Sequence, residues 1–134
     1  MTQIQSILLT DDDPDDRFLF EEALSVADAS VQLHIAVDGV DALEKLRAAS
    51  GLPDVIFMDV NMPRMNGIDC LRELSKSAFK SIPVIMYSTS SHYRKECFEN
   101  GAIDYMEKPS DFEQLCTKLK LVLRQGLPQI PNKL

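Results

Sequence analysis

The chain has 134 residues, of which 45% are hydrophobic and 26% charged, a composition typical of a single globular domain. Its formal net charge of −7 argues against nucleic-acid binding, and the sequence has neither an apolar stretch that could span a membrane nor a charged and then apolar leader. We therefore expect a cytoplasmic protein that binds neither nucleic acid nor a membrane.

Five short apolar runs have the length and composition of buried strands. They cover residues 4–10, 31–36, 54–59, 82–88 and 103–107. A helix-length segment with wider apolar spacing follows each run. The first of these segments begins with Asp13, which suits an N-cap, and Pro14, which suits the first helical position. The last carries an apolar stripe at Phe112, Leu115, Leu119 and Val122.

This alternation of strands and helices predicts an α/β fold. We expect one doubly wound, flavodoxin-like (βα)5 domain, with a five-stranded parallel sheet and helices on both faces. We place the domain at residues 1–126 and a short Pro-containing tail at 127–134, and we expect no output domain. The three cysteines lack the spacing of a disulfide framework or a zinc site, so we expect them to be small buried residues in a reducing compartment.

Carboxylates stand at the ends of two predicted strands. Asp11 and Asp12 follow the first strand and Asp59 ends the third, so they should meet at the edge where α/β sheets bind ligands. Two carboxylates about 4 Å apart repel each other by roughly 4 kcal/mol at an effective dielectric constant near 20. Such a cluster requires a cation or a raised pKa, and its oxygen ligands suit Mg²⁺ held together with a phosphate. We interpret the other acids of this segment as helix-capping and solvated residues: Asp13, Asp15 and Asp16.

Two further polar groups should lie at the same edge of the sheet. Ser88 ends the fourth strand, and Lys108, which precedes Pro109, follows the fifth. A hydroxyl and an ammonium beside metal-bound carboxylates are the groups that phosphoryl transfer requires, because they donate to the oxygens of the phosphoryl group. Each signal is weak by itself, and their order along successive strands makes the combination specific.

In these features the chain resembles the receiver domain of bacterial response regulators, in particular the chemotaxis-regulator type, over almost its whole length. The matching segments are residues 11–12, 38–43, 59–67, 83–88 and 101–109. The resemblance implies a protein of two-component signalling that is not a classical enzyme and catalyses only its own phosphoryl transfer and dephosphorylation. As the implied phosphoacceptor, Asp59 takes a phosphoryl group from a sensor histidine kinase or a histidine phosphotransfer protein and forms an acyl phosphate.

The resemblance also assigns a metal site and its neighbours. The side chains of Asp12 and Asp59 and the backbone carbonyl of Asn61 are the implied Mg²⁺ ligands, and Asp11 acts mainly through metal-bound water. Lys108 is the implied partner first of Asp59 and then of the phosphoryl oxygens. In this family the Lys-Pro bond is typically cis, so a cis bond between residues 108 and 109 is expected here.

Ser88 and Tyr105 are the implied switch. Phosphorylation draws the Ser88 hydroxyl to the new phosphoryl group, and Tyr105 turns into the space that this movement leaves. Thr10 differs from the apolar residue usual in the family, and we expect little effect from it. Thr89 is bulkier than the usual Ala or Gly, so it narrows access for a phosphodonor. The resemblance also implies that the side chains two residues after Asp59 and after Ser88 tune the lifetime of the acyl phosphate. Here these are Asn61 and Ser90, which are compatible with fast or moderate hydrolysis, so no lifetime is predicted.

The expected role is a signalling switch that binds a target protein or a relay intermediate that passes the phosphoryl group to a phosphotransfer partner. By resemblance, the docking surface consists of the fourth helix, the fifth strand and the fifth helix. The downstream target is not identified, and the protein is a monomer or a phosphorylation-dependent dimer.

Three other functions compete with this interpretation. A Mg²⁺-dependent phosphatase of the haloacid dehalogenase type also uses an Asp nucleophile, but it expects a second Asp where this chain has Asn61. A phosphorylation-independent interaction module would have lost part of the acidic pair, the acceptor or the Lys, and all are present. A flavodoxin requires a phosphate-binding loop after the first strand, where this chain is acidic.

Overall fold

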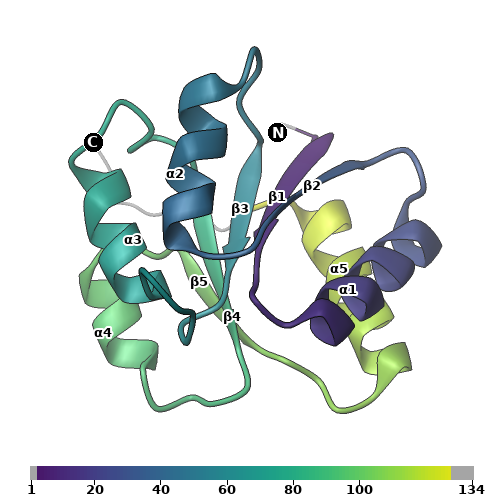
Figure 1. Ribbon diagram of the computed structural model, residues 1–134. Coiled ribbons are helices and arrows are strands. Elements are labelled where there is room, and N and C mark those ends of the chain that lie inside the picture. Colours follow the sequence, from purple (N-terminus) through teal and green to yellow (C-terminus); the bar gives the residue numbers. More distant parts are fainter. Residues whose placement is uncertain (1–2, 128–134) are drawn as a thin grey trace.

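The computed structural model describes residues 3–127, and within that range five strands alternate with five helices (Figure 1). The strands are β1 (Ser6–Thr10), β2 (Gln32–Ala36), β3 (Val55–Met58), β4 (Val84–Ser88) and β5 (Asp104–Glu107). The helices are α1 (Pro14–Ala27), α2 (Gly39–Ala48), α3 (Gly67–Ser75), α4 (Arg94–Glu99) and α5 (Phe112–Gln125). Apart from residue 127, the predicted tail lies outside the described residues.

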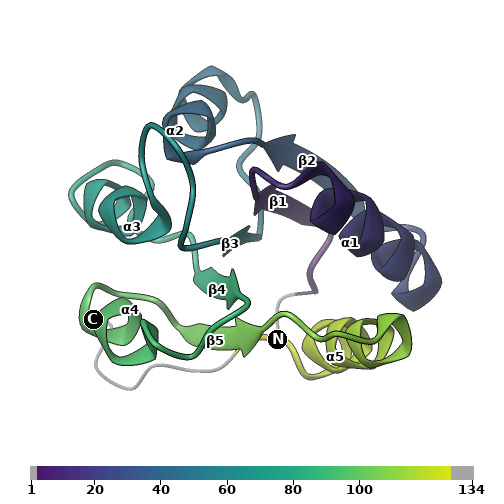
Figure 2. The same ribbon diagram turned by 60° about the horizontal axis from the view of Figure 1, so that its bottom comes forward.

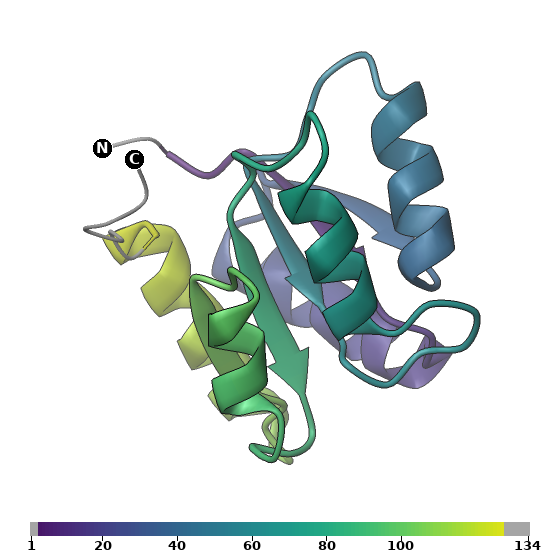
Figure 3. The same cartoon turned by 90° about the vertical axis from the view of Figure 1, so that its left-hand side faces the viewer.

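All neighbouring strands pair in parallel, in the order β2-β1-β3-β4-β5. Figure 2 shows the sheet between two helical layers, with α1 and α5 on one face and α2, α3 and α4 on the other. Helices α2, α3 and α4 lie side by side in Figure 3. This arrangement confirms the predicted doubly wound fold and places a ligand-binding crevice beyond the carboxyl ends of β1 and β3, where the strand order reverses. No helix within residues 3–127 is long and apolar enough to cross a membrane.

The sheet separates two hydrophobic clusters. Ile56 and Met58 of β3 join the cluster under α2, α3 and α4, whereas Val55 and Phe57 join the one under α1 and α5. Because β3 is buried on both faces, its sequence is a continuous apolar run rather than an alternating one. Phe20 of α1 packs edge-to-face against Phe57, with ring centroids 5.1 Å apart, and so attaches α1 to the centre of the sheet. The three cysteines are free and buried, as predicted.

Each strand begins one or two residues later than predicted. The apolar pattern indicates which residues are buried, not which residues form the hydrogen bonds of the sheet. Ile4 and Ile82 are buried, for example, although they precede their strands. Asp54 lies just outside β3 because its carboxylate accepts hydrogen bonds from the backbone N–H groups of Gln5 (2.8 Å) and Ser6 (3.0 Å). It therefore ties the start of β1 to the start of β3, at the end of the sheet opposite the crevice.

The first residue of α3 lies against the backbone that follows β3. The N–H of Gly67 donates to the carbonyl of Val60 (2.8 Å). A Cβ atom at Gly67 would lie 2.0 Å from the carbonyl oxygen of Asp59. Because this oxygen belongs to the backbone, the clash cannot be relieved by the movement of a flexible side chain. Only glycine therefore allows α3 to begin here.

We predict that Gly67→Ala lowers the free energy of unfolding by about 2 kcal/mol or more, because the added methyl group overpacks against the main chain. Gly51→Ala is the matched control, since a Cβ atom there has no heavy atom within 4 Å, and it should be neutral or stabilise by up to about 1 kcal/mol. Urea unfolding followed by circular dichroism measures both. Equal stability of the two variants would contradict the close approach at Gly67.

Candidate functional site

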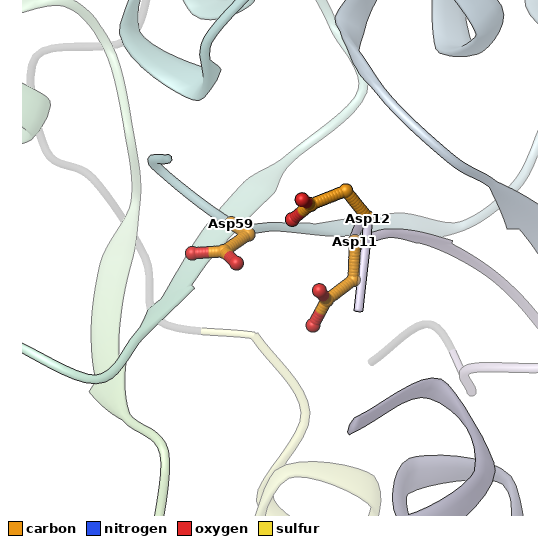
Figure 4. Close-up of side chains that lie close together, drawn as sticks. All are labelled: Asp11, Asp12 and Asp59. Atoms are coloured by element: carbon orange, nitrogen blue, oxygen red, sulfur yellow. The ribbon is translucent and has the colours of Figure 1, made fainter. Parts of the chain in front are cut away.

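Three carboxylates meet at the carboxyl edge of the sheet. Asp11 and Asp12 follow β1, Asp59 follows β3, and one oxygen from each lies within 4.8 Å of the others. Figure 4 shows the three side chains gathered there, with the carboxylate of Asp12 extending toward Asp59. Asp11 and Asp59 are buried, and Asp12 is exposed. The structure therefore brings together the acids that the sequence predicted to converge.

Backbone hydrogen bonds fix two of these acids by extending the strand ladders by one residue. The N–H of Asp11 donates to the carbonyl of Ala36 (3.0 Å), and the N–H of Asp59 donates to the carbonyl of Thr10 (2.9 Å). The carboxylate of Asp59 also accepts the N–H of Val60 through Oδ1 (2.7 Å). The positions of both side chains thus follow from the register of the central strands.

The ammonium of Lys108 lies among three carboxylates. Its Nζ atom is 2.8 Å from Asp11 Oδ2, 2.8 Å from Asp16 Oδ2 and 3.0 Å from Asp59 Oδ2, and its side chain is only 7% exposed. Sequence analysis placed Asp16 in solvent, so its contact with Lys108 was missed. The sequence places both Asp15 and Asp16 in the first turn of α1, and it carries no signal that distinguishes which of them contacts Lys108.

The expected cis bond between Lys108 and Pro109 is absent, since all peptide bonds within residues 3–127 are trans. The trans form is the more stable isomer of an X–Pro bond by about 0.5–1 kcal/mol. Lys108 reaches the site without a cis bond because its N–H donates to the carbonyl of Ser88 (2.7 Å) and its long side chain extends inward.

Burial and charge act in opposite directions on these groups. Burial raises the pKa of Asp11 to about 6, although the Lys108 ammonium opposes the shift. Burial also favours the neutral form of Lys108, but the carboxylates of Asp11, Asp16 and Asp59 outweigh it, so the pKa of Lys108 lies above its ordinary value. At neutral pH Lys108 is therefore an ammonium, held among the side chains of Asp11, Asp16 and Asp59.

The donor chemistry of this site fits a hard divalent cation such as Mg²⁺. The three clustered side chains all offer carboxylate oxygens, and the carboxylate of Asp12 is exposed to water. Within the described residues, Asp11 Oδ2 is buried without a hydrogen-bond donor, because the nearby ammonium of Lys108 lies off the direction that a hydrogen bond requires. Asn61 is exposed in the loop between β3 and α3, two residues after Asp59.

An ion pair between the exposed guanidinium of Arg64 and the buried carboxylate of Asp38 joins that loop to the start of α2. The guanidinium of Arg64 donates to both carboxylate oxygens of Asp38, at 2.7 and 3.1 Å, and Arg64 adopts a left-handed conformation with φ of 61°. Asp38 also caps α2 by accepting the N–H of Asp41 (2.8 Å), and the hydrogen bond from Arg64 holds the pKa of Asp38 below its ordinary value. In addition, the N–H of Gly39 donates to the carbonyl of Met65 (3.2 Å). These contacts give a structural role to the segment 38–43.

Ser88 ends β4, and Tyr105 is the second residue of the neighbouring edge strand β5, where it pairs with Met86. Ser88 is fully buried, and its hydroxyl accepts the N–H of Ser90 at 3.4 Å. Tyr105 is buried too, and its hydroxyl donates to the carbonyl of Ser90. The guanidinium of Arg94, which the sequence did not single out, lies 5.9 Å from the ring centroid of Tyr105 and 5.2 Å from that of Phe98.

Thr10 carries a buried polar group beneath this site. Its side chain is fully buried between two register neighbours, Ala36 and Met58, and within residues 3–127 its hydroxyl has no hydrogen-bond partner. An unpaired buried hydroxyl costs about 1–3 kcal/mol. The departure that the sequence showed at Thr10 therefore has an energetic consequence that we did not expect.

Comparison with known families identifies one match. Residues 7–120 match the response regulator receiver domain. Among curated relatives, an uncharacterized response regulatory protein of Vibrio cholerae is 34% identical over 122 residues, covering 90% of this chain and 49% of the relative. The response regulator MprA of Mycobacterium avium is 35% identical over 125 residues, covering 92% and 53%. The chain thus spans about half the length of the curated relatives that it matches.

Solved structures show the same fold. The phosphorylated cyanobacterial phytochrome response regulator RcpA superposes with a TM-score of 0.82 at 27% identity, covering 94% of this chain and 99% of that one. The Mn²⁺-bound form of response regulator Rcp1 has a TM-score of 0.79 at 26% identity, covering 93% and 99%. The chemotaxis response regulator CheY4 of Vibrio cholerae has a TM-score of 0.73 at 31% identity, covering 90% and 99%.

We predict that Thr10→Val raises the free energy of unfolding by about 1 kcal/mol, because it replaces the unpaired hydroxyl with a methyl group of similar volume. Thr117→Val is the matched control: Thr117 is exposed on α5, and the substitution should change stability by no more than about 0.5 kcal/mol. Thermal and urea unfolding measure the difference. Destabilisation by Thr10→Val would show that bound water satisfies the hydroxyl.

Proposed function

This chain belongs to the response regulator receiver domain family, and from this premise we propose that Asp59 accepts a phosphoryl group in a Mg²⁺-dependent reaction. The phosphodonor is a histidine kinase or a histidine phosphotransfer protein, and phosphorylation switches the surface to which partners bind. The observation that carries the proposal is the group of carboxylates from Asp11, Asp12 and Asp59 around the ammonium of Lys108.

The proposed reaction is a displacement at phosphorus. A carboxylate oxygen of Asp59 attacks the phosphorus atom of a phosphohistidine, the phosphorus–nitrogen bond breaks, and its electron pair remains on the imidazole nitrogen, which takes up a proton. The product on this chain is an acyl phosphate. Hydrolysis reverses the change when water attacks phosphorus, releases inorganic phosphate and restores the carboxylate.

The proposed Mg²⁺ ligands are the side chains of Asp12 and Asp59 and the backbone carbonyl of Asn61, with Asp11 acting through bound water. When bound, Mg²⁺ supplies positive charge to the oxygens of the phosphoryl group and offsets the repulsion between it and the carboxylates. The fit of the donor set to a hard cation supports this assignment.

Lys108 and Ser88 complete the site. The ammonium of Lys108 is buried 3.0 Å from Asp59, so it needs to move little to donate to phosphoryl oxygens on that residue. The hydroxyl of Ser88 supplies a further donor from the neighbouring strand. Both groups bind and orient the phosphoryl group, and neither exchanges a covalent bond with it.

We further propose that Ser88 and Tyr105 transmit the change. The hydroxyl of Tyr105 donates to the carbonyl of Ser90, which lies two residues after Ser88. Movement of Ser88 toward a phosphoryl group shifts this loop and leaves space into which the ring of Tyr105 turns. The surface of α4, β5 and α5 then changes, and a downstream protein in the cytoplasm binds to it, or the phosphoryl group passes on to a phosphotransfer partner.

We predict that incubation with acetyl phosphate and Mg²⁺ adds one phosphoryl group to the protein, and that Asp59→Asn or replacement of Mg²⁺ by EDTA abolishes the addition. Asp15→Asn is the matched control, because Asp15 is an exposed acid in the same region and should leave the addition intact. Intact-protein mass spectrometry provides the measurement.

A lack of phosphorylation requires a second donor before it is interpreted, because the exposed side chain of Thr89 lies beside Ser88 and narrows access to the site. A phosphorylated histidine phosphotransfer domain serves as that donor. If neither donor modifies the wild-type protein, or if the Asp59→Asn variant is modified equally, the proposed function is wrong.

A further inference from the structure

Asp16 lies beside the proposed cation site without belonging to it. The cluster that brings carboxylate oxygens within 4.8 Å of one another consists of Asp11, Asp12 and Asp59. Asp16 instead contacts that cluster's cationic neighbour, Lys108, at 2.8 Å, and its own side chain is 31% exposed. No role in the reaction proposed above uses this contact.

The ammonium of Lys108 donates hydrogen bonds to two carboxylates that lie in different segments of the chain. Well-directed hydrogen bonds run from Nζ to Asp16 (2.8 Å) and to Asp59 (3.0 Å), whereas the contact with Asp11 is short but poorly directed. Asp59 draws the ammonium toward the end of β3, and Asp16 draws it toward α1. The side chain of Lys108 is only 7% exposed, so these protein groups, and not water, set its position.

Asp16 is itself firmly placed by the start of α1. Asp13 caps the helix by accepting the N–H groups of Asp15 (2.8 Å) and Asp16 (3.2 Å), and Pro14 occupies the first helical position. The guanidinium of Arg17 donates to the carbonyl of Asp11 (2.9 Å), which ties this turn to the end of β1. These bonds fix the backbone of Asp16, and so they hold the base of its side chain in the first turn of α1, within reach of Lys108.

A divalent cation bound at this cluster would compete with the ammonium of Lys108 for the carboxylates of Asp11 and Asp59. Binding of the cation to Asp59, and to Asp11 through water, withdraws carboxylate charge from Lys108 and places two positively charged groups close together, which is unfavourable. Among the described residues, Asp16 is the one carboxylate in contact with Lys108 that is not a proposed partner of the cation. It can keep the ammonium neutralised and hold it on the side of α1, away from the cation.

We propose that Asp16 is a positioning residue for Lys108, and that by anchoring the ammonium it allows a divalent cation to bind at Asp11, Asp12 and Asp59. The inference rests on the proposed function, which supplies the cation. It assigns Asp16 an indirect effect on cation affinity, exerted through Lys108, and not the role of a ligand.

The direct test is Mn²⁺ titration of the unphosphorylated protein, with free Mn²⁺ measured by electron paramagnetic resonance. We expect Asp16→Asn to raise the Kd by about 5- to 10-fold, since a tenfold change corresponds to 1.4 kcal/mol, the scale of a hydrogen bond to a charged group. Asp15→Asn removes the same charge from an exposed neighbour that does not contact Lys108. All titrations are made in 0.5 M KCl, where exposed charges are screened, and Asp15→Asn should then change the Kd by less than about twofold. Asp16→Glu, which keeps the carboxylate, should restore most of the affinity.

The same substitution in a Lys108→Met protein separates an effect of Asp16 exerted through Lys108 from a direct effect of Asp16 on the cation. In Lys108→Met protein, Asp16→Asn should change the Kd no more than Asp15→Asn does, because there is no ammonium to position. A full 5- to 10-fold effect in that background would mean that Asp16 binds the cation itself, and the proposal would be overturned. Circular dichroism confirms that each variant is folded before titration.

The outcomes also distinguish this inference from the proposed function. Wild-type protein that binds no Mn²⁺ contradicts the metal site of the proposed function, and the role of Asp16 fails with it. Wild-type protein that binds Mn²⁺ with the same affinity as the Asp16→Asn variant leaves the proposed function standing and refutes the role of Asp16 alone.

Discussion

The structure depends on the balance between one ammonium and the carboxylates that surround it. Parallel strands bring Asp11 and Asp59 together because β1 and β3 are neighbours at the centre of the sheet, and their mutual repulsion has to be offset within the protein. Lys108 provides the offset, and it is held in place by the backbone of β4 and by contacts with three separate segments. The same carboxylates are the groups on which the proposed cation binding and phosphoryl acceptance depend, so the proposed function would change the charge balance that stabilises the site.

Much of this arrangement was predictable, because topology follows from periodicity. Alternating strands and helices with short connections allow few folds, and in a parallel sheet every residue that follows a strand lies at the same edge. The convergence of Asp11, Asp12 and Asp59, and the place of Ser88 and Lys108 beside them, required no knowledge of side-chain conformation. The burial of β3 and of the three cysteines followed from composition in the same way.

Features that depend on side-chain direction were not predictable. Asp16 and Asp15 are chemically identical neighbours in the sequence, and only the orientation of the first turn of α1 decides that one contacts Lys108 and the other faces solvent. The pair between Asp38 and Arg64 depends on a left-handed backbone at Arg64, which no local signal requires of an arginine. The trans bond before Pro109 differs from what the resemblance implied.

The brevity of α4 implies an uneven distribution of local stability across the fold. This helix spans six residues and buries only Cys97, whereas β3, on the opposite side of the site, buries every residue that it contains. Segments with few buried contacts open locally at a small free-energy cost, and core strands open only when the whole domain unfolds. Amide protons of α4 should therefore exchange with solvent through local opening, while those of β3 report global unfolding. Since Arg94 of α4 packs against Tyr105, a helix that should open locally adjoins the buried aromatic residue of the edge strand β5.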